Sequence, residues 1–448
     1  MPQQDDRLIR SEDRVQPHQP PVKTSMGKAS MTLASAMLVA SGANYLLNLF
    51  LARWMSPDEF GDANLMVTLM LATSAVAVAL QLLTARRIST SDDDMATAVR
   101  TANLRRAWAI GAAIGLASTA TAPMLRSVTS SASAVPFVIL GIGIPMYLAQ
   151  AVERGVLQGR LRFSRLAVTF LVEATTRLAA TLGAVALGFG VTGATAGLSL
   201  SFAASWLVAR PTGRLSPSLS SFQAPPDASG AARRAATATS VLLLAQIIIN
   251  NGDVVLAKVL FDAEEAGIYA VVALIGRGVF FLSWSIVMAA FPMAARDGGR
   301  AVVRQAVLTV AAVSATATAG VAVLMPYATD VIFGAEYTSA SGEFGRYAIA
   351  TSLFAVANVI ATLELAAGRG KVAAVVLAGA FFQTAILIFA DTPRAMIDTQ
   401  IKVMAVVVVT ALGVFLRSNP ERDQTNCPDI GIEHRPTAEA DHELNATR

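Results

Sequence analysis

The chain has 448 residues, of which 54% are hydrophobic and only 15% are charged. A soluble protein would carry about a quarter charged residues, and the apolar residues here form long blocks, so a soluble globular protein is excluded. The formal net charge of +4 could suggest a nucleic-acid partner. The basic residues lie in loops between apolar blocks, however, so we expect no nucleic acid.

Cysteine and histidine occur only near the two ends of the chain. The one cysteine, Cys427, and the three histidines, His18, His434 and His442, all lie in polar terminal stretches. An internal disulfide and a cysteine metal site are therefore excluded. A histidine metal site or proton relay within the membrane is excluded as well, and we expect no metal or other cofactor.

In chain order, a polar arm at 1–28 comes first, and we expect it to be disordered and cytoplasmic. About twelve apolar blocks follow, each near the roughly 20 residues that cross a bilayer as a helix. They lie at 30–52, 62–84, 107–125, 134–152, 166–188, 191–209, 237–257, 267–291, 303–325, 345–367, 371–390 and 399–416. The predicted fold class is therefore an all-α membrane protein.

A Pro/Ser/Gly-rich stretch after the sixth block divides the chain into two halves. The predicted parts are an N-terminal six-helix lobe at 29–210, a cytoplasmic linker at 211–236, a C-terminal six-helix lobe at 237–417 and a disordered cytoplasmic tail at 418–448.

The loops alternate in charge along the chain. Loops after even-numbered blocks are basic, with Arg86, Arg87, Arg100, Arg105, Arg106, Arg154, Arg160, Arg162, Arg165, Arg210, Arg214, Arg233, Arg234, Arg296, Arg300, Arg304, Arg369 and Lys371. The other loops are acidic, with Asp58, Glu59, Asp62, Asp262, Glu264, Glu265, Asp330, Glu336, Glu343, Asp391 and Asp398. The positive-inside rule then predicts that both termini are cytoplasmic.

The two halves also share a sequence pattern. LARWMSPDEFGDANL at 51–65 aligns with LAKVLFDAEEAGIYAV at 256–271, with Arg53 on Lys258 and Gly61 near Gly267. Six helices per half give both halves the same orientation, so we expect a parallel repeat about an axis normal to the membrane. The same alignment matches Ser41 with Gln246 and Asn48 with Asp253. Ser41 and Asn48 share one helix face, and so do Gln246 and Asp253, because each pair is spaced by seven residues. We expect these polar faces, with Asn250, to line a cavity between the lobes.

Two stretches resemble a known family. FLARWMSPDEFGDANLMVTLM at 50–70 and the segment at 153–197 are similar to the bacterial polysaccharide and oligosaccharide-lipid flippases of the multidrug/oligosaccharidyl-lipid/polysaccharide exporter superfamily. The resemblance implies alternating access between two six-helix lobes in the bacterial cytoplasmic membrane. It also implies a lipid-linked glycan substrate carried on undecaprenyl pyrophosphate, with membrane lipids and glycan-assembly proteins as partners.

Ionisable residues within membrane helices usually face a bundle interior or a cavity, because their insertion is costly. Glu173 and Arg177 lie one helical turn apart, and Arg277 has no acidic neighbour within a turn. Both arginines are candidates to bind a diphosphate bidentately. Alternatively, Glu173 and Arg177 only neutralise each other. Asp253 and Glu364 are candidates to couple transport to a proton or sodium gradient, although Asp253 could simply be solvated near its helix end.

Four arginines on the cytoplasmic side have two interpretations. Arg154, Arg160, Arg162 and Arg165 either supply positive-inside charge or form a cytoplasmic vestibule for an anionic head group. We expect Glu153 to pair with its neighbour Arg154.

There are three alternatives to a polysaccharide flippase. An enzyme would need catalytic groups on a sizeable external loop, and the predicted external loops are short, so we expect no enzyme. A cation-coupled multidrug and toxin extrusion antiporter would share the two-lobe architecture. A peptidoglycan-precursor flippase is the third alternative.

Overall fold

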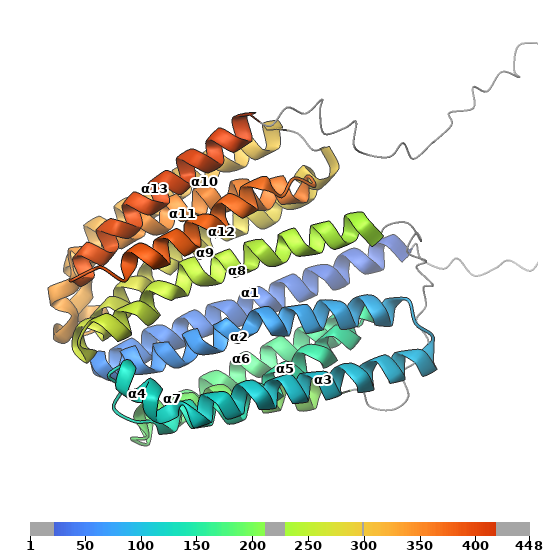
Figure 1. Ribbon diagram of the computed structural model, residues 1–448, viewed down its shortest axis with the longest axis horizontal. Coiled ribbons are helices and arrows are strands. Elements are labelled where there is room, and N and C mark those ends of the chain that lie inside the picture. Colours follow the sequence, from blue (N-terminus) through green and yellow to red (C-terminus); the bar gives the residue numbers. More distant parts are fainter. Residues whose placement is uncertain (1–21, 211–228, 298–299, 418–448) are drawn as a thin grey trace, which may run out of the picture.

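The computed structural model describes residues 22–210, 229–297 and 300–417. The first half of the chain forms seven helices that run back and forth along one long axis (Figure 1). They are α1 (Val22–Trp54), α2 (Pro57–Ser89), α3 (Asp93–Ala120), α4 (Ala122–Val128), α5 (Val135–Gly159), α6 (Phe163–Ala186) and α7 (Gly190–Ala209).

The second half repeats this arrangement beside the first. Its elements are α8 (Ser229–Leu260), α9 (Ala263–Asp297), α10 (Arg300–Ile332), the 3-10 helix η1 (Ala335–Ala340), α11 (Glu343–Ala366), α12 (Lys371–Leu387) and α13 (Pro393–Arg417). No strand occurs within the described ranges. Most of the predicted arm and linker and the whole predicted tail, with Cys427, lie outside the described residues. The remaining parts, 22–28 and 229–236, are the first turns of α1 and α8.

Every predicted membrane block corresponds to a helix. Ten helices of the described chain are long and apolar enough to cross a membrane, and the bent pair α3–α4 would make an eleventh. The helix expected at 371–390 is α12, which is apolar but shorter, at 17 residues. Large apolar side chains such as Leu187, Tyr327 and Phe389 are more than three-quarters exposed on the surface. A lipid-facing surface accounts for them, because soluble monomers rarely expose large apolar patches.

The same pairs of helices pack in both halves. In the first half these are α1–α6, α2–α5, α3–α5, α5–α7 and α6–α7. Their counterparts in the second half are α8–α12, α9–α11, α10–α11, α11–α13 and α12–α13. This correspondence agrees with the predicted parallel repeat.

The register of the repeat differs by one residue from the sequence alignment. Along residues 51–55, two buried residues are followed by two exposed residues and one buried residue. The same order of burial recurs at 257–261. Buried Ala52 therefore corresponds to Lys258, while Arg53 is exposed and corresponds to Val259. The sequence alignment matched residues of similar type, whereas the structural register follows from the pattern of burial at the ends of α1 and α8.

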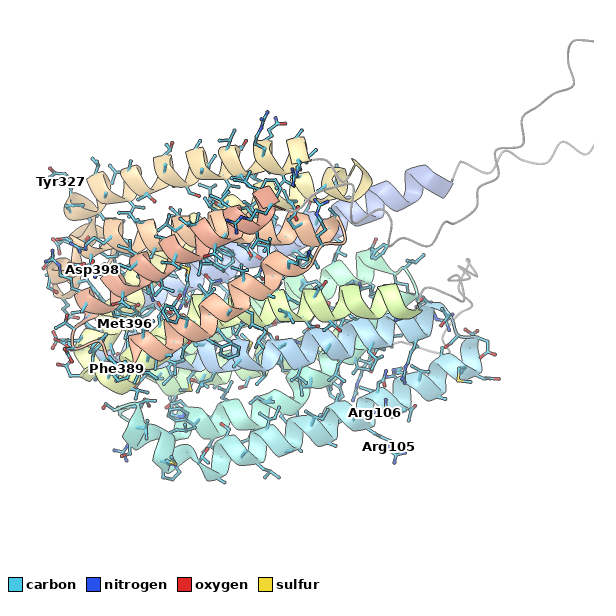
Figure 2. The ribbon with its side chains drawn as sticks, turned by 45° about the horizontal axis from the view of Figure 1, so that its top comes forward. Arg105, Arg106, Tyr327, Phe389, Met396 and Asp398 are labelled. Atoms are coloured by element: carbon cyan, nitrogen blue, oxygen red, sulfur yellow. The ribbon has the colours of Figure 1, made fainter. Side chains whose placement is uncertain are left out.

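Two arginines of α3 and an aspartate of α13 lie toward opposite ends of the bundle. In Figure 2, Arg105 and Arg106 lie toward one end, and Asp398 lies at the other with Tyr327, Phe389 and Met396. We call the end with the α1–α2 and α8–α9 turns the acidic end; it is on the left in Figure 1.

The two halves share a hydrophobic core at the acidic end. Leu51, Met55 and Phe60 of the first half pack in one cluster with Phe261 and Tyr269 of the second. Two other large clusters belong wholly to the second half or almost wholly to the first. The α1–α2 turn also approaches η1: burial raises the pKa of the Tyr337 hydroxyl, and the nearby carboxylates of Glu336, Asp58 and Glu59 raise it further. The lobes are thus packed together at the acidic end.

Candidate functional site

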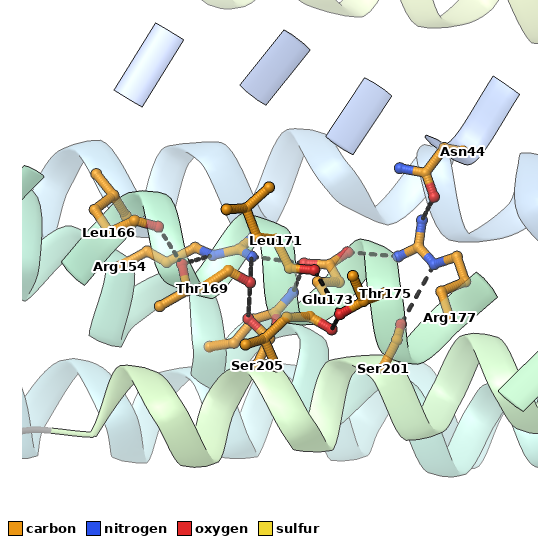
Figure 3. Close-up of polar contacts among 12 residues, drawn as sticks. Asn44, Arg154, Leu166, Thr169, Leu171, Glu173, Thr175, Arg177, Ser201 and Ser205 are labelled. Carbon is orange, nitrogen blue, oxygen red and sulfur yellow. Dashed lines mark hydrogen bonds and ion pairs between the residues drawn. The ribbon is translucent and has the colours of Figure 1, made fainter. Parts of the chain in front are cut away.

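A buried charge network lies inside the first lobe, between α1, α5, α6 and α7 (Figure 3). Its centre is the Glu173 carboxylate on α6, which accepts one hydrogen bond from Arg177 at 2.5 Å and one from Arg154 at 2.7 Å. Arg177 lies one turn further along α6, while Arg154 comes from α5. Gln150, one turn before Arg154, donates a weaker bond of 3.3 Å to the same carboxylate.

Neighbouring oxygens hold both guanidinium groups in place. Arg154 donates to the Thr169 hydroxyl and carbonyl, each at 3.1 Å, and to the Ser205 hydroxyl at 3.0 Å. Its guanidinium also lies 4.0 Å from the ring centre of Phe170, a cation–π distance. Arg177 donates to Asn44 on α1 at 3.1 Å and to Ser201 at 3.3 Å.

The charges of this network do not cancel. Arg154 and Arg177 bring two positive charges, and Glu173 supplies a single negative charge. The side chains of these three residues are 8%, 11% and 13% exposed. Mutual neutralisation of Glu173 and Arg177 is therefore an incomplete description, because Arg154 adds a second, largely buried cation.

A second polar network lies within the other lobe and centres on Asp253 of α8. One oxygen of this carboxylate accepts hydrogen bonds from Tyr347 at 2.6 Å, Tyr269 at 2.8 Å and Gln400 at 2.9 Å. These partners come from α11, α9 and α13, so Asp253 faces the interior of its own lobe. The alternative that Asp253 is solvated at its helix end is wrong, since the residue is 1% exposed.

Arg277 of α9 approaches Asp253 loosely. Its Nη2 lies 3.9 Å from the second carboxylate oxygen, too far for a hydrogen bond. That oxygen, and Nε and Nη2 of Arg277, have no hydrogen-bond partner among the described residues. A pocket with room for about one water molecule lies beside the network and is lined by Asn250, Tyr347 and Gln400, among others.

Two consecutive residues of α1 make contacts in different lobes. Asn44 accepts the hydrogen bond from Arg177. The hydroxyl of Tyr45 reaches across to α9, 3.5 Å from the Leu274 carbonyl, and a methyl group added to Gly278 would lie 2.7 Å from it. Gly278 follows Arg277 on α9, so this α1–α9 contact lies one residue along the chain from Arg277.

The other predicted cavity residues have partners of their own. Gln246 donates to Asn358 of α11 at 2.7 Å, inside the second lobe. Asn250 and Asn48 donate to carbonyls one turn back on their own helices. Gln246 and Asp253 make these hydrogen bonds within the second lobe, and the expectation that they line a cavity between the lobes stays a prediction.

The predicted vestibule arginines do not form a group. Arg154 belongs to the buried network, Arg160 pairs with Asp93 at 2.6 Å, and Arg165 donates to the carbonyls of Val208 and Arg210. Arg162 is partly exposed at the start of α6.

The expected pairing of Glu153 with Arg154 is wrong. Glu153 accepts two hydrogen bonds from Arg100, at 2.5 and 2.9 Å, because consecutive helical residues point in different directions. Glu364, a candidate for ion coupling, is likewise held by two hydrogen bonds from Arg369, at 2.6 and 2.9 Å.

Several residues of the two networks escaped the sequence analysis. Asn44, Gln150, Tyr269, Tyr347 and Gln400 carry no charge, so they do not stand out in an apolar helix. Gln150 lies four residues before Arg154, a spacing that places both side chains on one face of the helix and could have indicated its part in the network. Among the described residues, no group of three or more His, Cys, Asp or Glu side chains could hold a metal ion.

Comparison with known proteins identifies the family of this chain. Residues 26–296 match the model of a family described as polysaccharide biosynthesis protein. The match spans more than half of the 448 residues. The chain belongs to this family. A search of curated proteins found no match.

Solved structures similar to this member of the polysaccharide biosynthesis family are transporters. An inward-facing multidrug resistance MATE family transporter of the MOP superfamily gives a TM-score of 0.70 at 12% identity, covering 89% of this chain and 99% of that one. An outward-facing MATE structure gives 0.58 at 16% identity, covering 87% and 95%. A MOP superfamily transporter from Pyrococcus furiosus, described as having a binding pocket of reverse polarity, gives 0.55 at 16% identity, covering 87% and 96%. The fold is the one seen in these MOP superfamily transporters, and the ten candidate spans indicate a multi-pass membrane protein.

Proposed function

We propose that the protein flips a lipid-linked oligosaccharide or polysaccharide precursor, carried on undecaprenyl pyrophosphate, across the bacterial cytoplasmic membrane. The observation that carries this proposal is the surplus positive charge of the network formed by Arg154, Glu173 and Arg177. A buried unpaired cation is costly unless an anion completes it. A diphosphate is a suitable anion, because a guanidinium can donate two parallel hydrogen bonds to its oxygens.

The geometry supports a role for Arg177 in recognition. Its head group is the part of the network that also contacts α1, through Asn44, next to the α1–α9 contact between the lobes. Arg277 lies on α9 between Leu274 and Gly278, the residues that Tyr45 contacts, and two of its nitrogens have no hydrogen-bond partner within the described chain. We propose that these two guanidinium groups bind the diphosphate from opposite lobes when the lobes separate at this level.

We propose alternating access between the lobes at 29–210 and 237–417, with both termini and the linker in the cytoplasm. The loop charges support this orientation, so that the acidic end is external. Membrane lipids surround the apolar surface, and glycan-assembly proteins are the proposed partners on either side. No enzymatic step and no bound cofactor is part of this proposal.

Coupling to a proton or sodium gradient is proposed for Asp253. Its carboxylate is buried, one oxygen has no hydrogen-bond partner, and the only ion pair it makes within the described chain is loose. Gain of a proton or of a cation there would weaken the attraction to Arg277. Arg277 would then be freer to bind an anion.

A cation-coupled multidrug antiporter is the second candidate. The similarity to MATE structures supports it, as does the acid–tyrosine–glutamine network around Asp253. Such a transporter needs no surplus positive charge near its substrate. The Arg154–Glu173–Arg177 network therefore favours the anionic lipid substrate.

One reconstitution experiment separates the two candidates. Purified protein in liposomes is given a fluorescent polyprenyl-diphosphate oligosaccharide, and the fraction protected from a membrane-impermeant quencher is followed over time. The matched control substrate is a neutral glycolipid with the same sugar, and ethidium uptake is measured in parallel. Flipping of the diphosphate lipid alone supports the proposal. Ethidium transport without lipid flipping would overturn it.

A further inference from the structure

A fully buried lysine connects the two lobes. Nζ of Lys258, near the end of α8, lies 2.8 Å from Oδ1 of Asp62, in the first turns of α2, and the lysine side chain is 0% exposed. Each of the other ion pairs found between described residues joins elements of a single lobe. Among these ion pairs, the Asp62–Lys258 pair therefore stands apart because it joins the two lobes.

The two partners are not equally dependent on each other. Asp62 also accepts hydrogen bonds from the Ser131 hydroxyl at 2.8 Å and from the Ala132 backbone N–H at 3.1 Å, both within its own lobe. Lys258 has no second partner among the described residues. If the lobes separate, Asp62 keeps two donors, while the ammonium of Lys258 is left without a protein partner.

The backbones of the lobes touch beside this ion pair. A methyl group added to Gly61 of α2 would lie 3.0 Å from the Cα of Gly267 in α9, and 3.5 Å from Cδ of Lys258. One added to Gly267 would lie 1.7 Å from the carbonyl oxygen of Pro57. Only glycine allows the helices to approach so closely. The ion pair is thus enclosed in a tightly packed contact rather than exposed at its rim.

We propose that Asp62 and Lys258 form a latch that holds the lobes closed at the acidic end and opens when the transporter exposes that side. The inference rests on the proposed alternating access, for which one end must close while the other opens. A buried pair is favourable only in the closed arrangement, because separation or loss of one partner leaves a charge uncompensated. Opening hydrates Lys258, so the latch adds a barrier that the rest of the cycle must overcome.

The closed latch predicts a specific distance measurement. In a Cys427→Ser background, spin labels are placed at the exposed Ser127 on α4 and Ser339 on η1, one on each lobe near the acidic end. Double electron–electron resonance then reports the separation of the lobes in nanodiscs. The protein with an intact latch should give mainly one short distance. Asp62→Asn and Lys258→Met should each add a longer distance, while Lys258→Arg should keep the short one.

The matched control is Asp398→Asn, which removes the Arg346–Asp398 pair near the same end but within one lobe. It should leave the distance distribution unchanged. If a single variant is unstable because it leaves one charge unpaired, the double variant Asp62→Asn/Lys258→Met removes both charges and should still show the longer distance. Folded latch variants that keep only the short distance would overturn the proposal. Because no substrate is present, a failure of the flipping assay has no bearing on this result.

Discussion

Gly61 of α2 contacts Gly267 of α9, and the two glycines occupy equivalent positions in the two halves of the chain. Both follow the same turn: the amide of Phe60 donates to the carbonyl of Ser56, and the amide of Ala266 donates to that of Asp262. A contact between equivalent residues lies on the axis that relates the two halves. If the lobes alternate as proposed, the packing at this point should affect how readily the acidic end opens.

Gly267→Ala should bias the transporter toward opening at the acidic end. The added methyl group would overlap the backbone of Pro57, which cannot rotate away as a side chain could. Overpacking of this kind costs roughly 1–3 kcal/mol, equivalent to about a 5- to 150-fold shift between two conformations. Gly61→Ala should have a smaller effect, since its nearest contact is 3.0 Å. The spin-label distances measure both.

Gly320→Ala on α10 is the control for these variants. Nothing lies within 4 Å of a methyl group added there. It should leave the distances unchanged and slightly raise thermal stability, because alanine favours a helix over glycine. Identical distances in Gly267→Ala and Gly320→Ala would show that the Gly61–Gly267 contact does not limit opening.

The positions of the helices could be predicted from the sequence, whereas most of the site could not. A membrane helix is defined by its own hydrophobicity, so all predicted blocks coincide with helices. Arg53 and Lys258 look alike in sequence, as basic residues near the end of a first helix. One is exposed and the other is fully buried against Asp62. That difference in burial depends on contacts with the other lobe, and the residues near Arg53 or Lys258 in the sequence give no information about those contacts.

The same limit applies to the arginines near the cytoplasmic end. Arg154 and Arg160 both fit the positive-inside pattern, yet Arg154 points into its lobe at Glu173, and Arg160 pairs with Asp93. The packing of α5 against α6 and α3 distinguishes them, since Glu173 lies on α6 and Asp93 on α3. The charge pattern was sufficient to predict an orientation, but not which arginine is part of a site.

Orientation can be tested with single cysteines. In a Cys427→Ser background, a cysteine at exposed Ser339 should react with a membrane-impermeant thiol reagent added outside intact cells. The unmodified chain, whose only cysteine is Cys427, should react only after permeabilisation. Protection of position 339 in intact cells, with labelling after lysis, would reverse the proposed topology and place the latch on the cytoplasmic side.

Asp253→Asn should remove the response of transport to an ion gradient. Asparagine keeps an acceptor for Tyr269, Tyr347 and Gln400 but cannot gain or lose a proton or balance a cation. Flipping is measured in proteoliposomes with an imposed proton gradient, then with an imposed sodium gradient. Glu364→Gln is the comparison, because Arg369 already engages that carboxylate. It should keep the gradient response; loss of the response in Glu364→Gln alone would move the coupling site to Glu364.

The last prediction concerns the surplus charge of the first-lobe network. Arg177→Ala removes the guanidinium nearest the lobe contact and leaves Arg154 paired with Glu173, so the protein should still fold. Its flipping rate should fall at least about tenfold, since a hydrogen bond to a charged group contributes roughly 1.5–3 kcal/mol. Arg177→Lys should recover only part of the rate, because an ammonium cannot donate bidentately.

Glu173→Gln should behave differently: it leaves two buried cations without a carboxylate and should destabilise the fold by about 3–5 kcal/mol. Thermal melting separates this loss of stability from a loss of transport. A stable Arg177→Ala protein that flips the diphosphate lipid at the normal rate would leave the anionic-substrate proposal without its main support, and the antiporter would become the better explanation of the fold.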